Sequence, residues 1–84
     1  PEALEVRYEL ANAHFYAGHY QQAQSLNESL LSSYRAKLGD QHPLVADVLI
    51  NLGAVRAEVG DFQGAAARYR EALARTEAWY GPRH

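Results

Sequence analysis

The chain has no cysteine and no methionine, and only three prolines among its 84 residues. Without cysteine there is neither a disulfide framework nor a thiolate metal site, so side-chain packing alone must hold the fold together. No apolar run approaches the roughly 20 residues that a membrane-spanning helix needs, and no signal peptide opens the chain. We therefore expect a soluble, cytoplasmic protein whose small core leaves it marginally stable.

A strong positive charge is also missing. The formal net charge is −2, and the acidic excess lies in the first half of the chain. Nucleic acids and anionic membranes normally bind proteins through an excess of lysine and arginine. We therefore expect neither a nucleic-acid nor a membrane partner. The arginines near residues 68–75 alternate with glutamates, as on a solvated helix face, and Glu71 and Arg75 have the spacing of an ion pair.

Signatures of chemistry are absent as well. The sequence has no glycine-rich phosphate loop, no pairing of a nucleophile with a base, and no metal-ligand spacing. His14 and His19 are five residues apart, which predicts different faces of a helix, and His42 is expected to make local hydrogen bonds in a turn. We expect no catalytic residue, no cofactor and no metal site, and hence no enzyme.

What the sequence does contain is an internal repeat with a period of 42 residues. Residues 43–84 align with residues 1–42 without a gap. A period of this length is typical of stacked supersecondary units, and such arrays usually bind other proteins. The matched pairs include Pro1 and Pro43, Val6 and Val48, Leu10 and Leu52, Gly18 and Gly60, Ala23 and Ala65, Leu31 and Leu73, and Gly39 and Gly81.

Each unit is predicted to form two helices. In the second unit Pro43 suits the first turn of a helix, and Asp40 just upstream is expected to satisfy free amides there. Gly60 ends this helix, and Asp61 is expected to cap the next one. Between these points the apolar residues recur with helical spacing: Leu44, Val45, Val48, Leu49, Leu52, Val55 and Val59.

The predicted fold is all-α. Helices are expected at about 1–17, 19–37, 43–59 and 61–79. Short connections force consecutive helices to lie antiparallel, so each repeat, 1–42 and 43–84, becomes a helical hairpin. We expect the two hairpins to stack into one domain, which we interpret as a segment of a longer array.

Several residues of the second unit carry a family resemblance. Leu52-Gly53, Gly60-Asp61-Phe62, Ala65, Tyr69 and Ala72-Leu73 resemble the tetratricopeptide repeat signature, and the linker 38–43 is similar to that of the 42-residue variant found in kinesin light chain. The resemblance implies a helical superhelix whose first helices line a concave groove, where a peptide or helix of a partner protein lies.

The first unit departs from this pattern at several positions, and His14, like Arg56 in the second unit, stands where the family favours tyrosine. Arg7 stands where the family often has a large apolar residue, and Asn27 stands at the aromatic position that Tyr69 fills in the second unit. These departures indicate either looser packing in the first hairpin or other residues that fill the space. The candidate fillers are Phe15, Tyr16 and Leu26.

The candidate groove is aromatic and acidic. Aromatic rings supply contact area and carboxylates favour lysine or arginine, so the expected partner is a protein or peptide that is basic or contains aromatic residues. Glu5, Tyr8, Asn12, Phe15 and His19 have the spacing of one helix face. The candidate groove residues are Glu5, Tyr8, Glu9, Asn12, Phe15, Tyr16, Asp47, Ile50, Asn51 and Glu58.

Two interpretations stay open for these residues. Tyr8, Phe15 and Tyr16 either face a ligand or pack against a neighbouring hairpin. Asn12 and Asn51 resemble positions where some family members hold a peptide backbone by asparagine amides, but ordinary solvated asparagines have the same pattern. Tyr8 stands where relatives that bind a C-terminal carboxylate have lysine, so such a ligand is not expected.

The alternative function is self-assembly. Repeat arrays normally need about three units for stability, and a further unit would cover the last helix. We therefore expect a homo-oligomer formed through the ends of the array, as a dimer or as a continued stack. The candidate assembly surface comprises Tyr69, Leu73, Trp79 and Tyr80.

Overall fold

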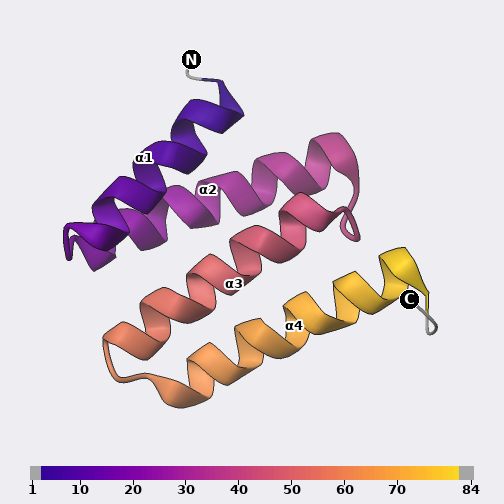
Figure 1. Cartoon of the computed structure of the whole chain (residues 1–84). Helices are drawn as coiled ribbons and strands as arrows, with labels where there is room; N and C mark the ends of the chain where they lie inside the picture. The colour runs from indigo at the N-terminus through magenta and orange to yellow at the C-terminus, as the bar shows by residue number, and fades with distance from the viewer. Residues whose placement is uncertain (1–2, 82–84) are drawn as a thin grey trace.

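The computed structural model describes residues 3–81, which form four helices: α1 (Leu4–Tyr16), α2 (Tyr20–Leu38), α3 (Pro43–Glu58) and α4 (Phe62–Tyr80). Consecutive helices run antiparallel, so that α1 and α3 share one direction (Figure 1). Within the described range there is no strand, and the predicted all-α fold of stacked hairpins is confirmed. No helix of residues 3–81 combines the length and the apolar character needed to cross a membrane.

The turns repeat with the sequence. A glycine with positive φ follows every helix, at Gly18, Gly39, Gly60 and Gly81. Glycine adopts this conformation without the steric strain that a side chain brings. Equivalent helices of the two units are therefore followed by glycines that lie 42 residues apart in the sequence.

The N-termini of α3 and α4 are capped by side chains. Oδ1 of Asp61 accepts a hydrogen bond from the backbone N–H of Gly64 (2.9 Å), as predicted. Nδ1 of His42 accepts one from the N–H of Leu44 (3.1 Å), which confirms its local role in the turn. The expectation that Asp40 serves these amides is wrong.

Asp40 instead joins the ion pairs that connect α2 and α4. Its carboxylate lies 2.6 Å from Nε of Arg35 and 3.2 Å from Nη2 of Arg75, and two guanidinium groups hold a carboxylate more strongly than an amide does. The expected pair of Glu71 with Arg75 is also wrong, because Glu71 faces Arg68 (3.3 Å) and Arg35 (3.8 Å). Each of these half-exposed pairs contributes at most about 1 kcal/mol.

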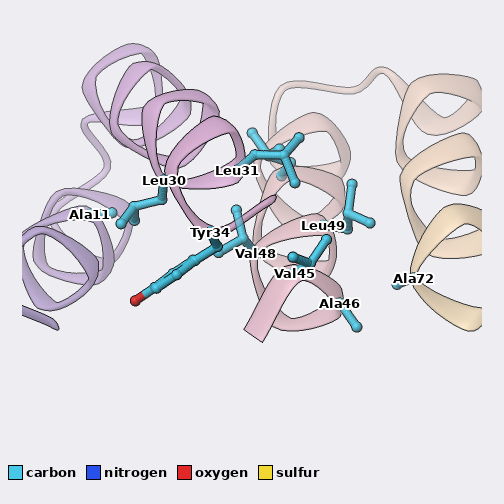
Figure 2. Packing of buried hydrophobic residues seen from close by; sticks show 10 residues of the cluster. Ala11, Leu30, Leu31, Tyr34, Val45, Ala46, Val48, Leu49 and Ala72 are labelled. Atoms are coloured by element: carbon cyan, nitrogen blue, oxygen red, sulfur yellow. The ribbon is translucent and has the colours of Figure 1, made fainter. Parts of the chain in front are cut away.

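The core lies mainly between α2 and α3. Leu31 of α2 lies on the side of α3 and Leu30 lies beside Ala11 of α1 (Figure 2), and both belong to the same buried cluster as the α3 residues Val45, Val48 and Leu49. Each fully buried leucine or valine contributes about 2 kcal/mol by leaving water. Tyr34 extends from this cluster with its hydroxyl at the outer tip, toward the side on which α1 lies.

Candidate peptide-binding groove

Three helices form the candidate groove. α2 packs against both α1 and α3 and lies between them (Figure 1). Two hollows follow one another along these helices, and each is lined by residues of α1, α2 and α3. Side chains of α1 and α3 therefore form the walls of the groove, and side chains of α2 form its floor.

The first hollow, called the acidic pocket, has a volume of about 250 Å³. None of its three carboxylates, Glu5, Glu9 and Asp47, forms an ion pair with another residue of the described part of the chain. Unneutralised carboxylates around a concave surface concentrate negative potential there. The lining residues are Glu5, Tyr8, Glu9, Tyr34, Leu44 and Asp47.

Tyr34 of α2 lines the acidic pocket and is itself buried. Its side chain is only 5% exposed. Burial raises the pKa of its phenol above the ordinary value, and the charge of Glu5 raises the pKa further, while nearby Arg7 lowers it. The guanidinium of Arg7 donates to Oγ of Ser29 (2.9 Å).

The second hollow, called the asparagine pocket, has a volume of about 120 Å³. Asn27 on its floor is 1% exposed, and its Nδ2 donates to the carbonyl of Ala23 (2.9 Å). This bond fixes the orientation of the amide, so that Oδ1 is left as an acceptor. The lining residues are Asn12, Phe15, Tyr16, Asn27, Asn51 and Ala54.

Two polar atoms of this pocket are buried and unpaired. Within residues 3–81, Oδ1 of Asn27 and Nδ2 of Asn51 have no hydrogen-bond partner. Leaving a buried donor or acceptor unpaired costs about 1–3 kcal/mol. A pocket that keeps one acceptor and one donor unpaired is therefore chemically prepared for a polar group that satisfies both.

The two pockets bring together eight of the candidate groove residues. Ile50 and Glu58 are exposed and line neither pocket. The sequence reasoning missed Tyr34 and Asn27 because it assigned the groove to the first helix of each hairpin only. The sequence did hold one signal for Asn27, because the second unit has the family's aromatic residue, Tyr69, at the equivalent position and the first unit does not. The pocket residues by unit are Glu5, Tyr8, Glu9, Asn12, Phe15 and Tyr16 in the first and Asp47 and Asn51 in the second.

This arrangement of repeated hairpins around a concave face matches a known family. Residues 2–78 match the family model described as tetratricopeptide repeat. The chain belongs to the tetratricopeptide repeat family. No curated protein matches the chain. Tetratricopeptide repeats generally mediate protein–protein interactions, and the family is a scaffold family that is generally not catalytic.

The aromatic residues of this tetratricopeptide groove differ in how far they are buried. Phe15 packs within the first hairpin, with its ring centroid 5.6 Å from that of Tyr20 on α2. Tyr8 is partly buried against the core. Tyr16, in contrast, is 84% exposed, so its ring is available to a ligand at the rim of the asparagine pocket.

The histidines of the first hairpin differ from the expectation. His19 does not continue the α1 face, because α1 ends at Tyr16 and the chain reverses at Gly18. The reversal brings Nδ1 of His19 within 3.1 Å of Nδ1 of His14, so the prediction that the two rings lie on separate faces is wrong. Among the described residues there is no group of three or more possible metal ligands.

The candidate assembly residues all lie on α4. These residues are largely exposed, and Leu73 is 59% exposed while its repeat counterpart Leu31 is buried. Trp79 contacts the ring of His42, with 5.2 Å between ring centroids. The four residues are Tyr69, Leu73, Trp79 and Tyr80.

Proposed function

We propose that this tetratricopeptide repeat chain binds an extended, basic segment of a partner protein in the groove between α1 and α3. The observation that supports this most strongly is the acidic pocket, where three carboxylates without an ion-pair partner in the described chain surround two tyrosine rings. Charge complementarity of this kind selects the partner and speeds its encounter with the protein.

A lysine or arginine side chain has the chemistry that this pocket needs. Its cationic head would pair with Glu5 and Asp47 on the opposite walls, and the face of Tyr8 or Tyr34 adds a cation–π contact. The apolar stem of such a side chain would lie against Leu44. No lysine or arginine lines the pocket, so a C-terminal carboxylate has no counter-ion there.

The size of the pockets favours an extended segment over a helix. An α-helix with its side chains is about 10–12 Å across. Hollows of about 250 and 120 Å³ have room for single side chains. An extended chain places such side chains into successive hollows while its backbone runs along the groove.

The test uses two variants with the same change of charge. Asp47→Lys places a cation inside the acidic pocket, whereas Glu77→Lys places one on α4, outside the groove. The probes are short acetylated, amidated alanine peptides that contain either one lysine or one glutamate. NMR titration should show the lysine peptide binding to the unmodified chain and to Glu77→Lys, and at least about tenfold more weakly to Asp47→Lys. Equal binding of lysine and glutamate peptides would rule out the proposal.

A second candidate function is self-association. It is supported by residues that are exposed in one unit although their counterparts in the other unit are buried. Val6 and Leu10 on α1 are exposed, whereas their counterparts Val48 and Leu52 are buried against α2. A second copy that places its α4 against α1 would cover them as α2 covers α3, a head-to-tail contact that continues the stack.

Light-scattering chromatography over a concentration series tests this second candidate. Self-association predicts a mass that grows with concentration, and Leu73→Glu on α4 should abolish the growth by placing a charge in the contact. The matched control is Ala74→Glu, an exposed neighbour on the same helix. A mass that stays that of one chain at all concentrations would exclude self-association and leave the groove proposal intact.

A further inference from the structure

We infer that the asparagine pocket binds the side-chain carboxamide of an asparagine or glutamine in the partner segment. The inference rests on the proposed groove function and specifies which side chain the second hollow accepts. It starts from the two unpaired atoms, the acceptor Oδ1 of Asn27 and the donor Nδ2 of Asn51, whose residues line the same pocket from α2 and from α3.

A carboxamide satisfies both atoms together. Its N–H and its C=O lie in one plane, and one N–H points to the same edge as the oxygen. The N–H would donate to Oδ1 of Asn27, and the C=O would accept from Nδ2 of Asn51. Burial in a pocket strengthens such bonds and makes an unmade one costly, so both partners gain only when the complete pair forms.

Other groups of a peptide satisfy at most one of the two atoms well. A trans main-chain peptide unit points its N–H and C=O in opposite directions, so it cannot meet Asn27 and Asn51 along one edge. A carboxylate only accepts, and it would face the oxygen of Asn27. A guanidinium or ammonium group only donates, and it would leave Asn51 unpaired.

The walls of the pocket also suit an amide. Phe15, Tyr16 and Ala54 present rings and a methyl group around the polar floor, and a planar carboxamide lies flat against such surfaces. The volume of about 120 Å³ exceeds the roughly 30 Å³ that one water molecule occupies in the liquid. A single bound water would therefore leave most of the pocket unfilled.

The position of the pocket relative to the acidic pocket sets the sequence spacing of the partner. On α1 the step from Tyr8 to Asn12 is four residues, or about 6 Å, and on α2 the step from Tyr34 to Asn27 is seven residues, or about 10 Å. An extended peptide advances about 3.3 Å per residue. The carboxamide should therefore stand about two or three residues from the basic residue.

The experiment compares peptides that differ at one side chain. The probes are acetylated, amidated alanine peptides with one lysine and, two or three positions away in either direction, glutamine, glutamate, leucine or threonine. NMR titration gives each dissociation constant, and the side-chain amide signals of Asn27 and Asn51 report the site. The glutamine peptide should bind roughly tenfold more tightly than the leucine and glutamate peptides, because only glutamine completes both hydrogen bonds.

Asn27→Leu supplies the matching protein variant, since leucine keeps the pocket floor filled but removes the acceptor. The preference for glutamine should disappear in this variant and persist in Gln24→Leu, where an amide of α2 outside the pocket is removed. Circular dichroism confirms that both variants are helical.

The outcomes separate this inference from the groove proposal. If the lysine peptides bind but glutamine, leucine and threonine are equivalent, the carboxamide inference is wrong and the basic groove stands. If none of the peptides binds, both fail. A glutamine preference that survives in Asn27→Leu also overturns the inference, because the recognition then lies elsewhere.

Discussion

The ring of Tyr69 on α4 lies directly against Gly53 on α3: a Cβ placed on this glycine would stand 2.6 Å from Cε1 of the ring. The first hairpin has Ala11 and Asn27 at the equivalent positions. An alanine and a tyrosine together would crowd each other in this geometry, so the alanine at position 11 fits the absence of an aromatic ring at position 27. The loss of the aromatic ring leaves the place where the asparagine pocket forms.

Gly53→Ala should destabilise the second hairpin. Crowding against Tyr69 costs about 1–3 kcal/mol, and the higher helix propensity of alanine offsets about 1 kcal/mol of it. Urea unfolding should show a net loss of up to about 2 kcal/mol in the free energy of unfolding. The double variant Gly53→Ala, Tyr69→Asn reproduces the first hairpin and should relieve the crowding, which a double-mutant cycle measures.

The matched control for this prediction is Ala11→Gly. It removes a methyl group from the buried face of α1, where Asn27 replaces the ring, and should therefore lower stability through propensity and lost packing without any relief of crowding. A Gly53→Ala variant that is more stable than the unmodified chain would show that the Tyr69 ring moves away freely.

His42→Ala should lower the free energy of unfolding by about 1 kcal/mol, because it removes the side-chain cap of α3. His42→Asn restores an acceptor at the cap but not the ring that contacts Trp79. The thermal unfolding temperature of His42→Asn should therefore lie between those of the unmodified chain and of His42→Ala. Fluorescence of Trp79, the one tryptophan of the chain, should change in both variants. Equal stability of the Asn and Ala variants would contradict a capping role.

Tyr34 should make the protein less stable in alkali. Its pKa is raised in the folded state, first by burial and then by Glu5. Above the ordinary tyrosine pKa of about 10, the unfolded chain releases a proton that the folded chain retains, so the free energy of unfolding falls as pH rises through the folded pKa. At a pH below the pKa of tyrosine in the unfolded chain, Tyr34 makes its full contribution to the free energy of unfolding.

The measurement is urea unfolding of the unmodified chain and of Tyr34→Phe at neutral pH and above pH about 10. The variant should lose less stability on the alkaline side, because phenylalanine does not titrate. Tyr16→Phe is the control, since this ring is almost fully exposed. Identical alkaline losses in the unmodified chain and in Tyr34→Phe would contradict the role assigned to Tyr34.

Asn27→Leu should stabilise the fold while it removes the proposed recognition of a carboxamide. Replacing a buried amide that has an unpaired oxygen by an apolar side chain of similar size removes the desolvation penalty, which amounts to about 1 kcal/mol or more. Thermal unfolding by circular dichroism measures the gain. Gln24→Leu, on a half-buried position outside the pocket, should change stability by less than about 0.5 kcal/mol. A destabilised Asn27→Leu would mean that its bond to Ala23 matters more than the unpaired oxygen.

Much of this protein could be predicted from neighbouring residues alone. Gly60 ends α3, Asp61 caps α4, and the apolar spacing from Val45 to Val55 defines the buried face of α3. Each of these signals acts within one or two helical turns, where backbone hydrogen bonding and side-chain geometry suffice. The all-α fold and the family follow from them and from the 42-residue period.

Contacts between residues far apart in the chain were not available in that way. The pairing of Asp40 with Arg75, the pairing of Glu71 with Arg35, and the place of Tyr34 in the acidic pocket depend on where the second helices turn their side chains. Small differences in packing angle decide this, and a periodic pattern does not encode them.

The sequence by itself therefore determined the helices, their ends and the charge of the candidate groove, because these depend on local hydrogen bonding, periodicity and composition. Only the tertiary structure decided that α2 contributes Asn27 and Tyr34 to the floor of that groove and leaves an amide oxygen unpaired there. The physical reason is that the surroundings of a buried side chain are set by its neighbours in space, and residues of three separate helices line the pocket that contains Asn27.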